Sequence, residues 1–221
     1  MHKEQFDTAL SLLQKLESLL SNSNIDTKWE LRITLFSNYS CVHKSKHNYF
    51  NALKYVEKAM KIENKLQIES VTTRLNACAI LSELKQHAKA FKYASKAVSA
   101  VKKGLKEEST SVKLYMLASL SYFSMGTQLE HLVKYEQALT AYVAAKHFNS
   151  LLGSETVSTK DLETAILDIE SRLQHRATNT LCESLSRASR TRHSEWSVKP
   201  SAPSKGKIRK PTFAHVYRCH C

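Results

Sequence analysis

Glycine and proline are both scarce in this sequence. Its 221 residues include four glycines and three prolines, and no proline precedes Pro200. Tight turns and strand ends rely on these two residue types, so a β-rich or α/β protein of this length would need many more. Helices joined by short polar loops need few of them. The composition therefore predicts an all-α protein.

Long apolar runs and a cysteine framework are missing as well. The N-terminal residues combine acids with amphipathic spacing, unlike the core of a signal peptide. The longest uncharged stretch, which includes residues 114–128, is shorter than a bilayer span and contains Ser, Thr and Gln. Five cysteines form an odd set without paired spacing, which suits a reducing compartment. We therefore expect a soluble cytoplasmic protein.

No motif for catalysis or metal binding is recognisable. His43 and His47 are an i,i+4 pair, but no third ligand is placed to complete a metal site. Near the C-terminus, His215, Cys219, His220 and Cys221 lack the paired C-x-x-C spacing of a structural zinc site. A glycine-rich phosphate loop and a nucleophile elbow are also absent from the sequence. We expect no enzyme activity, no cofactor and no metal.

Apolar residues recur at helical spacing along most of the chain. On the first helix Phe6, Ala9, Leu10, Leu13, Leu16 and Leu20 form one stripe, and Thr27 with Glu30 forms a capping box before the second. The periodicity predicts helices over residues 3–20, 28–44, 49–63, 67–84, 87–102, 109–131, 135–152 and 159–176. It then fades, so residues 179–221 are predicted to be a mostly unstructured tail rich in Ser, Arg and Lys.

Three segments of the chain follow one pattern. Each carries two alanines seven residues apart, a ring three residues before the first alanine, and a small residue twelve before it. The alanines are Ala52 and Ala59, Ala90 and Ala97, and Ala138 and Ala145; the rings are Tyr49, His87 and Tyr135; the small residues are Ser40, Cys78 and Gly126. Residues seven apart share a helix face, and alanine there lets two helices approach closely.

The third segment resembles a tetratricopeptide repeat, because it has Gly126, Tyr135, Ala138, Tyr142 and Ala145 at that family's spacing. The first two segments are similar to it, although a serine and a cysteine stand where the family prefers glycine. The first alanines are 38 and 48 residues apart, against a family period of about 34. Longer first helices or longer loops between repeats would account for the difference.

The resemblance, which includes small protist and ciliary scaffold proteins, implies a right-handed α-solenoid of antiparallel helix pairs over residues 1–178. We expect a half-repeat at residues 3–20, repeats at about 28–64, 67–102 and 109–152, and a capping helix at 159–176. The alternative is a generic helical bundle in which the alanines coincide by chance.

The resemblance also implies a binding surface on the concave side, formed by the first helix of each pair. Asn38 and Asn76 lie two residues before the small residue of their repeats, where the family often uses an amide to bind a peptide backbone; Ser124 is the third equivalent. The alternative is that these amides cap local backbone or face solvent. Recognition of a chaperone tail is disfavoured, because Ser37, Cys41, Leu120 and Ser124 replace most of the residues it requires.

Positive charge is concentrated at the C-terminal end. The formal net charge is +13, and residues 184–221 hold nine Lys or Arg against Glu195 alone. Arg187, Arg190, Arg192, Lys205, Lys207, Arg209 and Lys210 are the candidate contacts to an acidic partner. Between residues 54 and 65 Lys and Glu alternate, so the charge of the repeat region is expected to cancel there.

These observations together favour a non-catalytic scaffold or adaptor. The repeats would hold a peptide or helix of another protein, and the tail would dock on an acidic surface such as the tubulin tails of a microtubule or ciliary assembly. A cytoplasmic protein, in a cytoskeletal or ciliary setting, fits this prediction. The alternatives are a nucleic-acid-associated helical-repeat protein and a non-catalytic subunit of an enzyme complex.

Overall fold

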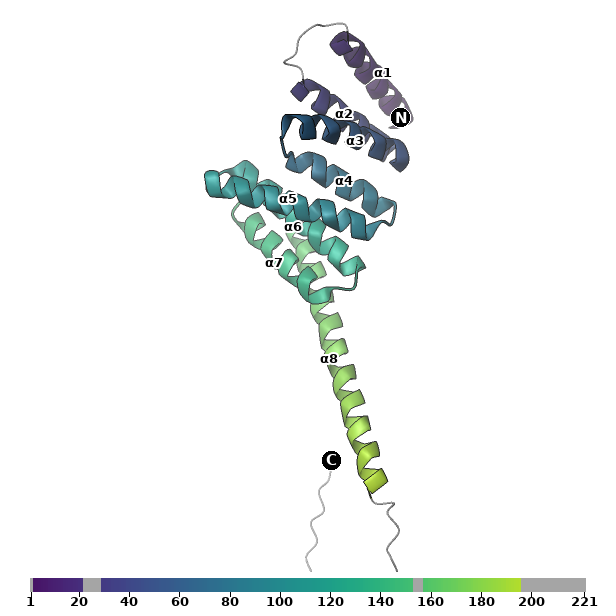
Figure 1. Cartoon of the computed structure of the whole chain (residues 1–221), viewed down its shortest axis with the longest axis vertical. Coiled ribbons are helices and arrows are strands. Elements are labelled where there is room, and N and C mark those ends of the chain that lie inside the picture. Colours follow the sequence, from purple (N-terminus) through teal and green to yellow (C-terminus); the bar gives the residue numbers. More distant parts are fainter. Residues whose placement is uncertain (1, 22–28, 153–156, 196–221) are drawn as a thin grey trace, which may run out of the picture. The chain divides into compact units, whose positions relative to one another are not determined.

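The computed structural model describes residues 2–21, 29–152 and 157–195, and within them all regular secondary structure is α-helical (Figure 1). The helices are α1 (His2–Ser21), α2 (Trp29–Ser45), α3 (Tyr49–Leu66), α4 (Val71–Glu83), α5 (His87–Glu107), α6 (Val112–His131), α7 (Tyr135–Ser150) and α8 (Thr159–Glu195). Each predicted helix has a counterpart, and the expectation of an all-α protein is confirmed.

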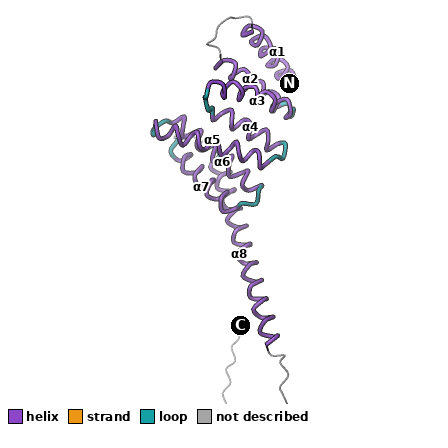
Figure 2. The backbone as a smooth tube through the Cα atoms, in the orientation of Figure 1, coloured by secondary structure: helices purple, strands orange, loops and turns teal. Residues whose placement is uncertain are grey.

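Six of the helices form three antiparallel pairs. Helix α2 packs on α3, α4 on α5 and α6 on α7, with a short turn inside each pair (Figure 2). The first helices α2, α4 and α6 also pack against one another in succession, whereas the described second helices lack comparable contacts with each other. The first helices therefore line the inner side of the stack and the second helices its outer side, as in an α-solenoid.

The turn inside each pair has the same backbone geometry. His47, Lys85 and Val133 occupy it with φ of 56°, 58° and 60°, in the left-handed region. In every case the amide of this residue donates to the carbonyl three residues earlier at 2.9 Å, and the next amide donates to the carbonyl five residues earlier. These bonds satisfy carbonyls at the end of the first helix. The repeat in the sequence is therefore also a repeat in backbone structure.

The ten extra residues between the second and third alanine pairs lie entirely in helices. Helix α5 has 21 residues against 18 in α3, and α6 has 20 against 13 in α4. The loops between pairs, residues 67–70 and 108–111, are equal in length. Longer helices therefore account for the ten extra residues, and longer loops do not. The second helix α5 is lengthened as well as the first helix α6.

The small residues of the repeat lie at the contacts between paired helices. The six alanines are all fully buried; they are Ala52, Ala59, Ala90, Ala97, Ala138 and Ala145. Ser40, Cys78 and Gly126 on the first helices are also buried. A Cβ atom on Gly126 would lie 2.7 Å from the ring of Tyr142 on α7. The helices of the third pair can therefore approach only because this position has no side chain.

Two details of the first half of the chain differ from the prediction. Helix α4 begins at Val71 instead of residue 67, because Gln67 has a left-handed φ of 55° that ends α3 and Ser70 caps α4 by accepting from the Thr73 amide at 3.3 Å. On α1, Leu16 was predicted to belong to the buried stripe but is exposed, as are Leu12 and Leu19. The predicted capping residue Thr27 lies outside the described residues.

The first part of α8 covers the open end of the third pair. Leu162 and Ile169 are fully buried in one cluster with Leu129, Ala138 and Tyr142. Asn149 fixes the entry to this helix, since its side-chain amide donates to the Val157 carbonyl at 2.9 Å and its carbonyl accepts from the Val157 amide at 3.3 Å. This packing satisfies the need of a solenoid for an end cap.

Helix α8 continues to Glu195, whereas the capping helix was predicted to end at residue 176. The first compact unit of the chain ends at Ala177 and the second begins at Thr178, so each contains part of α8. Leu181 and Leu185 are exposed. Residues 178–195 are helical and contain neither Gly nor Pro, and the side chains described among them, at 178–185 and 187, are all exposed. A criterion based on core periodicity therefore missed them.

Candidate functional site

The predicted contact residues share the inner face of the first helices. Asn38 on α2 is exposed, and Asn76 on α4 and Ser124 on α6 are half-buried. They occupy equivalent positions on three helices that pack in succession, so they lie along one face of the stack. Within the described residues, none of these three side chains takes part in a hydrogen bond. Of the alternative prediction, local capping is therefore not their role here, whereas facing solvent describes the exposed Asn38.

Neighbouring side chains on this face are uncharged and mostly small. Further accessible positions lie one turn before and one turn after each of the three residues. They share the same face because residues three or four apart are neighbours on a helix. We define the inner face as Thr34, Asn38 and Cys41 on α2, Thr72, Asn76 and Ala79 on α4, and Leu120, Ser124 and Thr127 on α6. None of these nine residues is Lys, Arg, His, Asp or Glu. Such a face offers amide and hydroxyl hydrogen bonds to a backbone without a strong field.

The buried Cys78 next to this face is not reactive. Burial raises the pKa of its thiol to about 11, so the thiolate that would act as a nucleophile or metal ligand is scarce at neutral pH. In the residues that the structure describes, no group of three or more His, Cys, Asp or Glu side chains is arranged to hold a metal ion. His215, Cys219, His220 and Cys221 lie outside those residues.

The histidine pair of α2 takes part in packing with tyrosines. The ring of His43 stacks on Tyr55 with centroids 5.3 Å apart, while His47 lies edge-on to Tyr49. Burial, with a smaller effect of Lys46, lowers the pKa of His43 below its ordinary value. Because the two imidazoles contact different rings, they do not converge on one ligand.

The same aromatic group attaches α1 to the first pair. Tyr39 stacks on Tyr55 at 4.5 Å, and its hydroxyl donates to the Glu17 carboxylate at 2.9 Å. Burial and this hydrogen bond raise the pKa of Tyr39 well above its ordinary value. The half-repeat is therefore joined to the stack by a polar contact as well as by its buried leucines.

The predicted contacts of the basic tail are only partly described. Arg187 is exposed on α8 and lies 3.7 Å from Glu183, and the backbone of Arg190 and Arg192 belongs to the same helix. The remaining cationic residues of that set lie outside the described residues; they are Lys205, Lys207, Arg209 and Lys210. No helix among the described residues is long and apolar enough to cross a membrane.

Neither a family model nor a curated protein sequence matches this chain. Several solved structures have a similar fold. BtubC (BKLC) from P. vanneervenii has a TM-score of 0.64 at 17% identity, over 96% of this chain and 83% of that one. The apo form of RapI has a TM-score of 0.65 at 16% identity, over 89% of this chain and 69% of that one. The Sgt2 TPR domain from Aspergillus fumigatus has a TM-score of 0.48 at 13% identity, over 80% of this chain and 90% of that one.

These identities show the fold alone. This chain has a tetratricopeptide-like helical-repeat fold. The likeness to BtubC spans nearly all of this chain.

Proposed function

We propose that the protein is a non-catalytic scaffold whose inner face binds a segment of another protein. The observation that carries this proposal is the continuous run of accessible, uncharged side chains across α2, α4 and α6, with the two free amides of Asn38 and Asn76 along it. An amide can donate to a peptide carbonyl and accept from a peptide amide at once. A bound peptide or helix would therefore find partners for its backbone in successive repeats.

Asparagine substitution tests this proposal. A partner is first identified by pull-down from native extract, and its affinity is then measured for Asn38→Ala, Asn76→Ala and the double variant. Each single change should weaken binding by about 1–2 kcal/mol with little loss of stability, because a polar contact is removed and no packed side chain is lost. Asn51→Ala/Gln137→Ala on the second helices α3 and α7 is the matched control, since both residues are exposed. If the Asn38→Ala/Asn76→Ala variant bound every partner with wild-type affinity, the inner face would not be the binding surface.

The basic C-terminal residues extend the proposal to an acidic surface. Their charge suits an acidic protein such as the tubulin tails of a cytoskeletal or ciliary assembly, in the cytoplasm. Binding of the full chain to microtubules should survive nuclease treatment, weaken with salt and be lost when residues 184–221 are removed. If nucleic acid is the partner instead, the full chain should retard RNA or DNA in a gel. The logarithm of affinity would then fall with the logarithm of salt concentration by about 0.7–0.9 per phosphate contacted.

A further inference from the structure

The outer side of α5 carries a run of lysines without any acid. No Asp or Glu occurs between Glu83 and Glu107. Lys89, Lys92, Lys96 and Lys103, which we call the lysine row, are all exposed. At about 100° per residue, the first, third and fourth of these lie within about 40° of one another around the helix, and Lys92 lies close beside them. The row is about 21 Å long at about 1.5 Å per residue.

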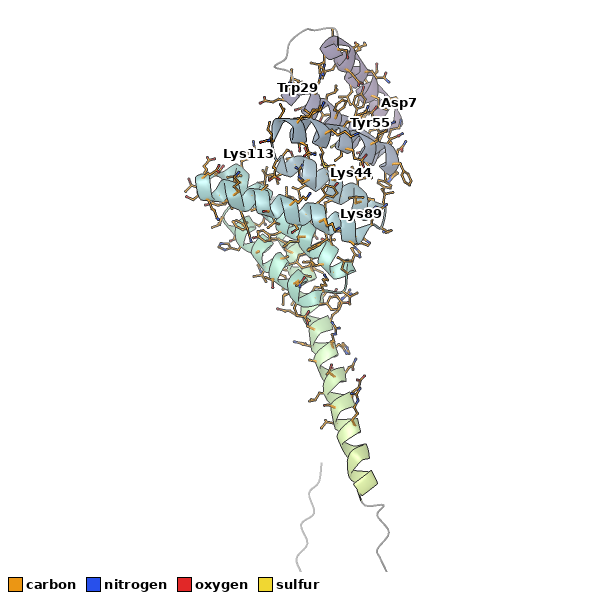
Figure 3. The ribbon with its side chains drawn as sticks, in the orientation of Figure 1. Asp7, Trp29, Lys44, Tyr55, Lys89 and Lys113 are labelled. Carbon is orange, nitrogen blue, oxygen red and sulfur yellow. The ribbon has the colours of Figure 1, made fainter. Side chains whose placement is uncertain are left out.

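The charges of the lysine row are not neutralised by neighbours. Within the described chain, none of the four ammonium groups has a carboxylate within ion-pair distance, whereas Lys46 and Lys146 elsewhere do. Figure 3 labels Lys89 near the start of α5, away from Lys113 at the start of α6. Four solvated like charges in one line produce a local positive field that a neutral surface would lack.

Helix α3, which packs on the other side of α4, adds to this field. The sequence suggests that its lysines and glutamates cancel, but Glu63 is fully buried. Its carboxylate accepts from Arg74 Nη1 at 2.7 Å and from the Thr73 hydroxyl, both on α4. Helix α3 therefore exposes Lys54, Lys61 and Lys65 against Glu57 alone. The expectation of cancelling charge is wrong on the outer surface, because one of the acids is used inside.

A hollow at the far end of the row offers polar contacts from both second helices. It has a volume of about 510 Å³ and is bordered by Lys103 and Gly104 on α5 and by Asn64 at the end of α3. Gln67 and Glu69 in the following loop, and Glu107 one turn after Lys103 on α5, also border it. These two carboxylates would repel further acids of a bound segment, so the acid-free stretch ends at this hollow.

We infer that the lysine row binds an acidic segment of a protein, on the side of the solenoid opposite the inner face. A nucleic-acid surface would be expected to offer rings for base stacking or arginines for bidentate contacts. The row has no arginine, and the rings of Phe91 and Tyr93 on α5 are partly buried against neighbouring helices. Lysine ammonium groups on long flexible stems suit a row of carboxylates of variable conformation. The lysine row is therefore a second surface, separate from the inner face proposed to bind a peptide.

The test uses the full chain and a fluorescein-labelled peptide of about twelve glutamates, which at about 3.3 Å per extended residue exceeds the length of the row. We expect salt-sensitive binding by fluorescence anisotropy. The triple variant Lys89→Glu/Lys96→Glu/Lys103→Glu should bind at least about tenfold more weakly. The matched control Lys15→Glu/Lys113→Glu/Lys160→Glu changes the net charge equally at exposed lysines on α1, α6 and α8. Its affinity should fall by less than about threefold.

Each outcome decides the question. Equal losses in the two triple variants would show that net charge alone drives binding and would overturn the site, as would wild-type affinity of the row variant. Tighter binding of a labelled DNA duplex or RNA strand, lost in the row variant only, would replace the acidic segment with a nucleic acid and overturn the inference. The Asn38→Ala/Asn76→Ala variant should bind the glutamate peptide normally, so failure of the groove and failure of the row are distinguishable.

Discussion

At the scale of single residues, the repeat adjusts two facing positions to each other. Gly126 faces Tyr142 in the third pair, while the equivalent positions are Ser40 and Val56 in the first pair and Cys78 and Ala94 in the second. All of these residues are buried. As the first-helix residue grows from Gly to Ser to Cys, its counterpart shrinks from Tyr to Val to Ala. Close packing explains the trend, because the space between paired helices is fixed by the alanines.

This compensation predicts a strong coupling in the third pair. Gly126→Ala should lower the free energy of unfolding by about 1–3 kcal/mol, because the new methyl group overlaps the Tyr142 ring. In a Tyr142→Val background the same substitution should cost less than about 0.5 kcal/mol, since the ring is gone and alanine favours the helix. Urea unfolding of the four proteins in this cycle measures the coupling. An equal cost in both backgrounds would contradict the packing argument.

Val133 is the second residue whose environment predicts an effect of substitution. It holds a left-handed φ of 60° although it is β-branched, and its side chain is 55% exposed, so little burial offsets the strain. Val133→Gly should therefore raise the free energy of unfolding by about 0.5–1 kcal/mol. Lys85→Gly, at the equivalent turn, is the comparison and should gain less because lysine is not β-branched. Thermal unfolding of the two variants measures the difference, and a loss of stability in Val133→Gly would show that the turn is not strained.

At the scale of helices, the junctions between successive pairs differ in chemistry. The first junction contains the buried ion pair of Glu63 and Arg74, whereas Val101 takes the equivalent position of Glu63 in an apolar second junction. Arg74→Met should destabilise the protein by about 3–5 kcal/mol, because Glu63 would remain buried without its partner. Adding Glu63→Val should restore most of that loss. Chemical denaturation of the single and double variants measures both steps, and a double variant no more stable than Arg74→Met would refute the explanation.

The contact between the second and third pairs predicts a dependence on pH. His87 and His131 stack with centroids 4.0 Å apart, and His87 Nδ1 donates to the buried Gln128 Oε1 at 3.0 Å. Desolvation, then repulsion by His87 and by Lys85, lowers the pKa of His131, and Glu130 opposes this in part. The folded state therefore takes up a proton less readily than the unfolded state, whose histidine pKa is about 6.5.

The sign of this effect follows from linkage. His131 contributes its full share of stability when the pH is above the pKa of the unfolded state. This share is lost as the pH falls from that value through the lower pKa of the folded state. Stability should decrease as pH falls below about 6.5, and His131→Gln should make the decrease shallower. His43 supplies a further part, since its pKa is lowered too. Identical slopes in wild type and His131→Gln would exclude this origin.

At the scale of the whole molecule, the stack needs α8 for its end cap but not for its whole length. A chain ending at residue 177 keeps Leu162 and Ile169, whereas the removed Leu181 and Leu185 are more than 60% exposed. Its stability should stay within about 1 kcal/mol of wild type. A chain ending at residue 158 loses both buried side chains and should be less stable by about 3–6 kcal/mol. Denaturation of the two truncated proteins tests this, and equal stabilities would remove α8 from the core.

The sequence by itself determined the helices and the equivalence of the three pairs. Both follow from local information: scarce helix breakers, a 3.6-residue apolar period and small residues at fixed spacing. The shared face of Asn38, Asn76 and Ser124 could be predicted in the same way, since equivalent positions in stacked repeats align. The row from Lys89 to Lys103 was not predicted, although no acid interrupts it in the sequence.

Only the tertiary structure decided which of these side chains face solvent. Glu63 looks like a surface charge beside its lysines until Arg74, eleven residues away in the chain, draws it into the interior. Leu16 fits the helical stripe of α1 but is exposed, because the helix is turned toward Tyr39 and Leu35. Local periodicity gives the face of a helix, whereas burial depends on what the neighbouring helix presents to that face.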